Sequence, residues 1–211
     1  MKKTALLAAM MTAGTILAET TPAMISLVTP VQFPSAEYDV KGLRFDLIYG
    51  VSRNFTGLDL GIANHTRGDF AGVALGGFNL TDGRIRGGQL AIVNWNDNGA
   101  RNWENNSFGV QWGLLNNADT FCGWQSGVIS ISGDEFTGLQ AAFLNVAKDL
   151  RGVQLGCYFL CGVNVADTLD GVQAGIVNYA EHVKGGCQIG LVNIIKQGGW
   201  MPVFPFLNGN F

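Results

Sequence analysis

Acidic side chains are the first candidates for chemistry, because paired carboxylates can serve as general acid and general base. Asp46 and Asp59 fall in strand-like stretches, where we expect a carboxylate to face solvent. Asp134 and Glu135 follow Gly133 and are typical of loop charge. Catalysis also needs a pocket and a partner group. We predict no catalytic residue among them.

Nucleophiles and metal ligands are equally sparse in this chain. The serine group Ser126, Ser130 and Ser132 has no histidine near it in the sequence pattern, and the 2 histidines, His65 and His182, lack ligand-like spacing to the cysteines. The chain contains no GxSxG, Walker or HExxH motif. The sequence therefore predicts no enzyme, no cofactor and no metal site.

The 4 cysteines leave two interpretations open. Cys122, Cys157, Cys161 and Cys187 form an even set, which in an exported protein permits disulfides in any of three pairings. Three of them stand where other parts of the chain place apolar residues, so they can equally be small buried hydrophobes.

Composition narrows the class of protein. The chain of 211 residues is 47% apolar, with a mean hydropathy of +0.21, enough apolar surface to fold. Charged residues make up only 14%, and the net charge is −3 with a pI near 5.3. Phosphate binding needs clustered Lys and Arg. A nucleic-acid partner is therefore not expected.

The amino-terminal segment has the pattern of a secretory signal peptide. Lys2 and Lys3 precede an apolar stretch over residues 5–17, which is too short to span a bilayer, and Ala18 suits a cleavage site. We predict a signal peptide at 1–18, a lead-in or cap at 19–41, a repeat domain at 42–199 and a carboxyl-terminal cap at 200–211. The mature protein is thus expected to be exported.

A glycine-led repeat of 14 or 15 residues, with two longer spacings of 22 and 19, dominates the remaining chain. Glycine accounts for 30 of the 211 residues, far above its average usage of about 7%. Each unit begins with one glycine of the series Gly42, Gly57, Gly72, Gly87, Gly109, Gly123, Gly138, Gly152, Gly171 and Gly186. The unit from Gly171 reads GVQAGIVNYAEHVK.

Side chains alternate within each unit. Counting the leading glycine as position 1, positions 2, 4 and 6 are mostly apolar, which predicts a β-strand with these residues in the core. Position 8 is usually Asn, and position 3 is Gln in the last seven units: Gln89, Gln111, Gln125, Gln140, Gln154, Gln173 and Gln188. We interpret Gln and Asn as a polar outer face with a ladder of stacked glutamines. Ile176→Asp should then unfold several units, and Gln173→Ala should cost only about 1 kcal/mol.

Two all-β folds fit this repeat. In a β-solenoid of about ten 14–15-residue units, like residues stack in register, which explains why every unit carries the same residues. In an outer-membrane β-barrel meander, each unit gives one antiparallel strand. The alternation is shorter than the roughly 9–11 residues of a membrane strand, and antiparallel neighbours would not repeat Asn at both ends. The solenoid is our prediction, with the barrel as its alternative.

The long spacing after Gly87 predicts a polar loop from Trp95 to Ser107. Trp95 and Trp103 in this loop are candidates for contact with a partner, although two aromatic rings can also serve local packing of the loop. Insertions in repeat proteins often carry a binding surface.

The units, together with the opening YDVKGLRFDLIYGVSRNFTGLDLGIAN, resemble a bacterial surface-repeat protein family defined by tandem G-[LV]-Q-x-G-[LIV]-x-N units after a signal peptide. That resemblance implies a cell-surface or outer-membrane location and transfers no activity. Arg44, Asp59 and Ala74 depart from the pattern at position 3. We expect a surface-associated structural or interaction protein with an unknown protein or glycan partner; the alternative is a barrel that acts as a pore or binding protein.

Overall fold

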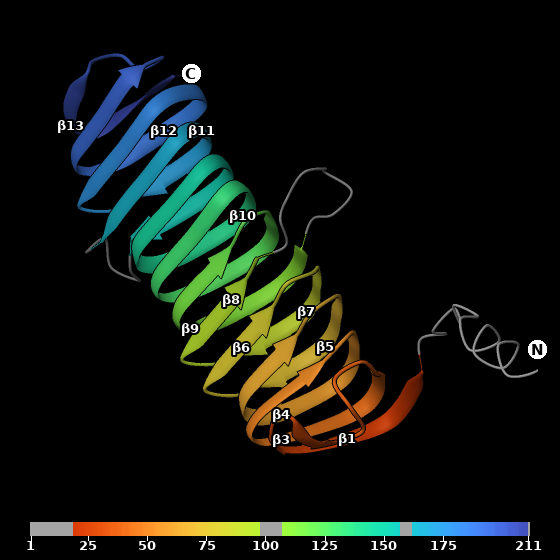
Figure 1. The fold of residues 1–211 in the computed structure, drawn as a ribbon. Helices are drawn as coiled ribbons and strands as arrows, with labels where there is room; N and C mark the ends of the chain where they lie inside the picture. Colours follow the sequence, from red (N-terminus) through yellow and green to blue (C-terminus); the bar gives the residue numbers. More distant parts are fainter. Residues whose placement is uncertain (1–18, 98–106, 157–161, 211) are drawn as a thin grey trace, which may run out of the picture.

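The chain folds into a β-solenoid in which each glycine-led unit forms one coil. A computed structural model describes residues 19–97, 107–156 and 162–210. Figure 1 shows the coils stacked into a rod, with the strand that begins at Thr20 at one end and the strand that ends at Asn210 at the other. We number the ten coils from the one led by Gly42 to the one led by Gly186. The strands are β1 (Thr20–Val28), β2 (Val31–Phe33), β3 (Asp39–Ser52), β4 (Phe55–Thr66), β5 (Phe70–Leu75), β6 (Phe78–Thr81), β7 (Ile85–Leu90), β8 (Val93–Asn96), β9 (Ser107–Ala118), β10 (Phe121–Gly156), β11 (Val163–Ala174), β12 (Val177–Gln197) and β13 (Val203–Asn210).

Neighbouring coils pair in parallel and in register. Gly152 lies beside Gly171 and Gln154 beside Gln173 where β10 meets β11, and the same matching of like residues holds between β9 and β10. Among the described strands, antiparallel pairs occur only at the ends, between β1 and β2 and between β12 and β13. The predicted solenoid is confirmed, and the alternative of an antiparallel barrel is wrong.

The leading glycines let the coils approach each other closely. All ten adopt a positive φ, between 108° and 146°, which L side chains rarely adopt. At Gly171 a Cβ atom would also lie 1.9 Å from the carbonyl oxygen of Gly152 in the coil before. Backbone conformation and coil spacing therefore both require glycine at position 1.

The predicted assignment of inner and outer faces is wrong. The position-3 glutamines and position-8 asparagines lie inside the coils, where their exposed fraction is 0–1%, whereas Leu114 and Ile176 at position 6 point outward. The alternation of apolar and polar side chains along a strand shows that the two faces differ, but it does not show which face turns inward. The stacking of coils determines which face turns inward. An amide side chain can hydrogen-bond to its copy in the next coil, and it can therefore enter the interior at little cost.

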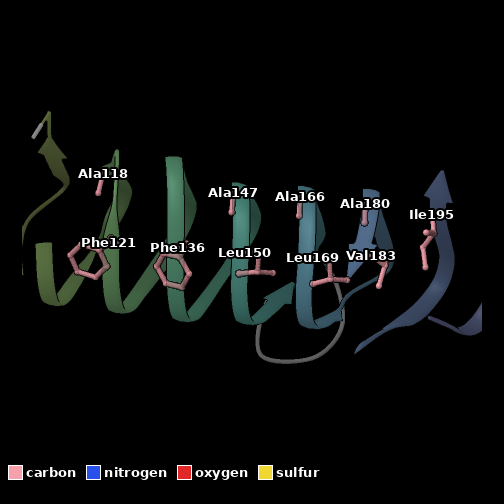
Figure 2. Close-up of a cluster of buried hydrophobic side chains, with 10 residues drawn as sticks. All are labelled: Ala118, Phe121, Phe136, Ala147, Leu150, Ala166, Leu169, Ala180, Val183 and Ile195. Carbon is pink, nitrogen blue, oxygen red and sulfur yellow. The ribbon is translucent and has the colours of Figure 1, made fainter. Parts of the chain in front are cut away.

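An apolar core occupies the other half of each coil. Figure 2 shows two rows of side chains along the rod, one mostly of alanine and one of larger residues. In the carboxyl-terminal coils this cluster comprises Ala118, Phe121, Phe136, Ala147, Leu150, Ala166, Leu169, Ala180, Val183 and Ile195. A second cluster fills the first coils with Met24, Val40, Phe55, Phe70, Ala74 and Ile85. The core thus comes from the closing half of the unit, not from positions 2, 4 and 6.

Candidate functional site

The seven position-3 glutamines form one hydrogen-bonded ladder inside the rod. Each side-chain Nε2 donates to Oε1 of the glutamine in the preceding coil, as in Gln173 to Gln154 at 2.7 Å and Gln188 to Gln173 at 2.7 Å. The ladder begins at Gln89, whose Nε2 donates to Thr81 Oγ1 at 3.1 Å. Because the ladder is enclosed, its amides bind one another and offer nothing to an external partner.

Asparagines at position 8 form a second ladder of opposite polarity. Asn64 Nδ2 donates forward to Asn79 Oδ1 at 2.9 Å, and Asn178 donates forward to Asn193 at 2.8 Å. Ser130 replaces asparagine in coil 6 and interrupts this ladder. The two ladders together use most of the polar interior, so they are structural rather than catalytic elements.

A buried charged cluster replaces the glutamine ladder in the first two coils. Arg44 forms a two-pronged ion pair with Asp59, in which its Nε donates to Oδ1 at 2.8 Å and its Nη2 to Oδ2. The remaining guanidinium nitrogen, Nη1, donates to Ser52 Oγ at 2.6 Å and to the His65 carbonyl at 2.9 Å. The expectation that Asp46 and Asp59 face solvent is wrong, because Arg44, Asp46 and Asp59 are each about 1% exposed.

Asp46 is the second carboxylate beside a single arginine. Its Oδ2 lies 3.1 Å from Arg44 Nε, but neither carboxylate oxygen has a hydrogen-bond partner within the described part of the chain. Burial raises the pKa of Asp46 to about 7, Arg44 opposes the rise, and Asp59 adds to it. Because all three side chains are enclosed in the rod, a substrate could not reach them, and the cluster is a weak candidate for catalysis.

The other predicted candidates are scattered. Cys122 and Cys187 are free thiols at half-buried sites, and Cys157, Cys161 and Trp103 lie outside the described residues. Trp95 lies in β8 with 43% of its surface exposed. Within the described ranges, no three His, Cys, Asp or Glu side chains gather closely enough to hold a metal ion.

The most prominent surface of the rod is uncharged and apolar. Positions 2, 4 and 6 of successive coils form one side of the solenoid, which we call the apolar face, and no described residue there is charged. Its exposed large hydrophobic residues are Leu43, Phe45, Leu47, Leu58, Ile62, Val73, Leu75, Leu90, Ile92, Val110, Trp112, Leu114, Trp124, Val128, Phe143, Ile176, Ile189 and Leu191. Contiguous apolar surface on this scale marks an interaction site.

Exposed charges of the coils gather elsewhere, in the closing turn from position 11 onward. Surface ion pairs join such turns in neighbouring coils, as in Arg84–Asp69, with 2.6 Å between nitrogen and oxygen, and Lys148–Asp134 at 3.2 Å. We call this border the charged edge. The rod is therefore amphipathic across its section, with charge on one border and the apolar face free of it.

Near the middle of the rod the apolar face is hollowed. A depression of about 720 Å³ lies over coils 3 to 6, with Leu75, Leu90, Trp112, Leu114 and Val128 among its lining residues. Its floor includes Ser126, which occupies position 4 in coil 6 where coil 5 has Trp112. Ser126 and the glycines Gly76, Gly113 and Gly127 at position 5 line the depression with little side-chain volume.

Sequence reasoning identified the residues of the apolar face but placed them in the core. The signal that could have found the surface is the recurrence of amides at positions 3 and 8. Glutamine in coils 4 to 10 and asparagine in most coils can each bond to its copy in the next coil, whereas the apolar positions vary from Gly88 to Trp112, as an outer surface tolerates.

Comparison of the chain with family models, with curated proteins and with solved structures finds no match in any of the three. Within the described ranges no helix is long and apolar enough to cross a membrane.

Proposed function

We propose that this protein is an exported, surface-associated structural and interaction protein without catalytic activity, and that it acts through the apolar face. The observation that carries the proposal is the continuous, uncharged apolar surface along the coils, which includes Trp112 at 60% and Leu191 at 61% exposure. Such a surface is unfavourable in water unless something covers it.

The interior supports the absence of catalysis. The polar side chains within the rod are enclosed and bonded to each other, so that a substrate would have no access to Arg44, Asp59 or the glutamine ladder. A rigid, repetitive rod held by coil-to-coil hydrogen bonds suits a scaffold that presents one long surface.

Export and surface location rest on the sequence. Lys2, Lys3 and the apolar stretch that follows them have the pattern of a signal peptide, and the repeat resembles the bacterial surface-repeat family. The partner is a protein rather than a glycan in this proposal, because aliphatic side chains lack the hydrogen-bonding groups that sugars need.

The test uses a photo-crosslinking amino acid placed at Leu114 on the apolar face of the full precursor, in bacterial cells. Irradiation should give a covalent adduct at this position, in the cell-envelope fraction. A matched variant with the same amino acid at Lys148 on the charged edge should give none.

Two results would contradict the proposal. One is an uncleaved protein confined to the cytoplasm. The other is an apolar face that forms no adduct in the envelope fraction although the protein is folded there.

A further inference from the structure

The geometry points to a second copy of this chain as the occupant of the apolar face, stacked face to face and running in the opposite direction. This inference rests on the proposed function, since it requires the apolar face to be an interaction surface. It adds the identity of the partner and the arrangement of the two rods.

The size of the apolar face matches a protein interface. Ten coils lead from Gly42 to Gly186, and at about 4.8 Å each they span roughly 48 Å. Positions 2 to 6 cover at most roughly 16 Å across the strands, since the chain bends at positions 5 and 6 in coils 3, 4 and 9. The footprint of at most about 770 Å² is close to the roughly 800 Å² that each partner buries in a standard interface.

Side-chain size changes along the position-4 column in a way that suits self-association. Coils 2 to 5 carry the large residues Leu60, Leu75, Leu90 and Trp112, whereas coils 6, 7 and 9 carry Ser126, Ala141 and Ala174. The three small residues are at most 9% exposed, while Trp112 is 60% exposed. One half of the column is therefore a ridge and the other half mostly a trough.

An opposite running direction sets ridge against trough. A twofold axis along the strands, passing between coils 5 and 6, places Trp112 of each copy over Ser126 of the other. The same axis places Leu90 over Ala141, Leu60 over Ala174 and, at position 2, Gly88 against Leu139. In the other two coil pairs it sets Leu75 against Leu155 and Phe45 against Ile189, so the fit of large to small residues holds in three of the five coil pairs. A twofold axis along the rod would instead set Trp112 against Trp112 and leave Ser126 facing Ser126, with a gap.

A smaller cavity beside Ser126 agrees with this axis. This cavity of about 190 Å³ is lined also by Val110, Trp112 and Trp124. It lies where the indole of the second copy would enter. An isologous contact of this kind closes after two copies and does not propagate into a fibre.

Lipid is the less suitable occupant. The chain is acidic overall, with a net charge of −3, which disfavours approach to an anionic membrane. A fluid lipid surface also gives no reason for the change from large to small residues along one column. Complementary steps in size are instead typical of two rigid surfaces that fit each other.

Sedimentation of the purified mature protein tests the inference. At about 50 µM, above the micromolar Kd at the weak end for interfaces of this size, the protein should be a dimer. Trp112→Ser leaves two holes and Ser126→Trp sets tryptophan against tryptophan, so each should raise the dimer Kd about tenfold or more. The combined variant W112S/S126W exchanges ridge and trough and should restore the dimer.

Two controls distinguish variants that have lost the interface from variants that have lost the fold. Phe78→Ser removes an aromatic side chain of 46% exposure from another side of the rod, and it should leave the dimer unchanged. Thermal melts should show Trp112→Ser and Phe78→Ser folded, because both side chains are substantially exposed to solvent in the single chain, and the melts test whether Ser126→Trp keeps the fold at a site of 4% exposure.

Orientation is measured with spin labels at Thr56 of both copies, the residue directly before Gly57 at the start of coil 2. The opposite running direction separates the labels by roughly 34 Å or more along the rod, seven coil spacings. A monomer at this concentration, single variants that dimerise normally, or labels close together would each overturn the inference. A monomer that floats with neutral phosphatidylcholine vesicles would overturn it in favour of lipid.

The crosslinking experiment distinguishes this inference from the proposed function. An adduct at Leu114 with twice the mass of the chain supports both. An adduct only with another molecule overturns the second copy as occupant but leaves the interaction surface standing.

Discussion

Asp46 is the residue whose position is hardest to reconcile with its charge. It is enclosed with Arg44 and Asp59, and the two-pronged pair of Arg44 with Asp59 already balances the single positive charge. A second ionised carboxylate in this space would be an uncompensated buried charge, which is costly. The raised pKa of Asp46, about 7, is the consequence.

This gives a pH-dependent prediction for Asp46→Asn. Between its usual pKa of 3.8 and the folded value of about 7, the unfolded chain releases a proton that the folded protein keeps, so wild-type stability falls as the pH rises. Asparagine removes this loss. The variant should be more stable at pH 8 by about 4 kcal/mol at most and equal to wild type near pH 4, as thermal melts at both values will show. Equal midpoints at pH 8 would mean that Asp46 ionises without penalty.

Two adjacent glycines give a second prediction at this scale. Gly87 has a φ of 138°, and a Cβ there would lie 2.0 Å from the Gly72 carbonyl oxygen, whereas a Cβ at Gly88 would meet nothing within 4 Å. Gly87→Ala should therefore destabilise the protein by about 3 kcal/mol or more, since strain and collision add. Gly88→Ala should change stability by about 0.5 kcal/mol or less. Urea unfolding of both variants compares them directly, and similar losses would contradict the role of the leading glycine.

The amide ladders explain how whole coils tolerate a polar interior. Glutamine side chains donate toward the amino-terminal end of the rod and asparagine side chains toward the carboxyl-terminal end. Their dipoles oppose each other, so the two ladders do not build up one large dipole along the rod. Each amide is also held by its neighbours, which makes the ladder cooperative.

Gln173→Ala tests the ladder at this scale. Gln173 accepts from Gln188 and donates to Gln154, so its loss leaves a buried donor and a buried acceptor short of partners. We expect a loss of roughly 3 kcal/mol instead of the roughly 1 kcal/mol expected for an outer face. Gln188→Ala removes a residue that only donates within the ladder and should cost about half as much. Chemical denaturation measures both, and equally small losses would show that the ladder adds little.

The inversion of faces gives a paired prediction for two adjacent coils. Ile176 is 37% exposed, so Ile176→Asp should cost about 1 kcal/mol or less. Leu169 is fully buried in the core, and Leu169→Asp should unfold the surrounding coils because it buries an unpaired charge. Circular dichroism of the two variants distinguishes the faces, and the reverse order of stability would restore the assignment made from the sequence.

At the scale of the molecule, the rod ends because its parallel stacking ends. The last coil pairs with the antiparallel strand β13, and Asn208 Nδ2 donates to the Met201 carbonyl at 2.8 Å to hold the turn. At the other end β2 runs antiparallel to β1. Such ends protect strand edges that would otherwise template further pairing.

Removal of residues 200–211 tests this protection. The truncated protein should expose the β12 edge and form larger assemblies with concentration, which light scattering detects. The full chain at equal concentration is the control. A truncated protein that stays as small as the full chain would mean that the β12 edge does not recruit other chains.

The repeat, its leading glycines and the strand alternation can all be predicted from the amino-acid sequence, because these features depend on local backbone geometry and recur along the chain. From the spacing of Gly42 to Gly186 and the stacked glutamines, the parallel solenoid could be predicted, as could the existence of two distinct faces. Both features depend only on one unit and on the similar unit stacked next to it.

Which face turns inward, and what Asp46 and Arg44 contact, could be learned only from the stacked coils. Alternation along a strand is symmetrical between inside and outside, and burial of Gln173 becomes favourable only when Gln154 and Gln188 lie directly above and below it. That environment exists only after the coils stack, so the apolar surface that the rod presents follows from the assembly of coils and not from the hydrophobicity of its residues.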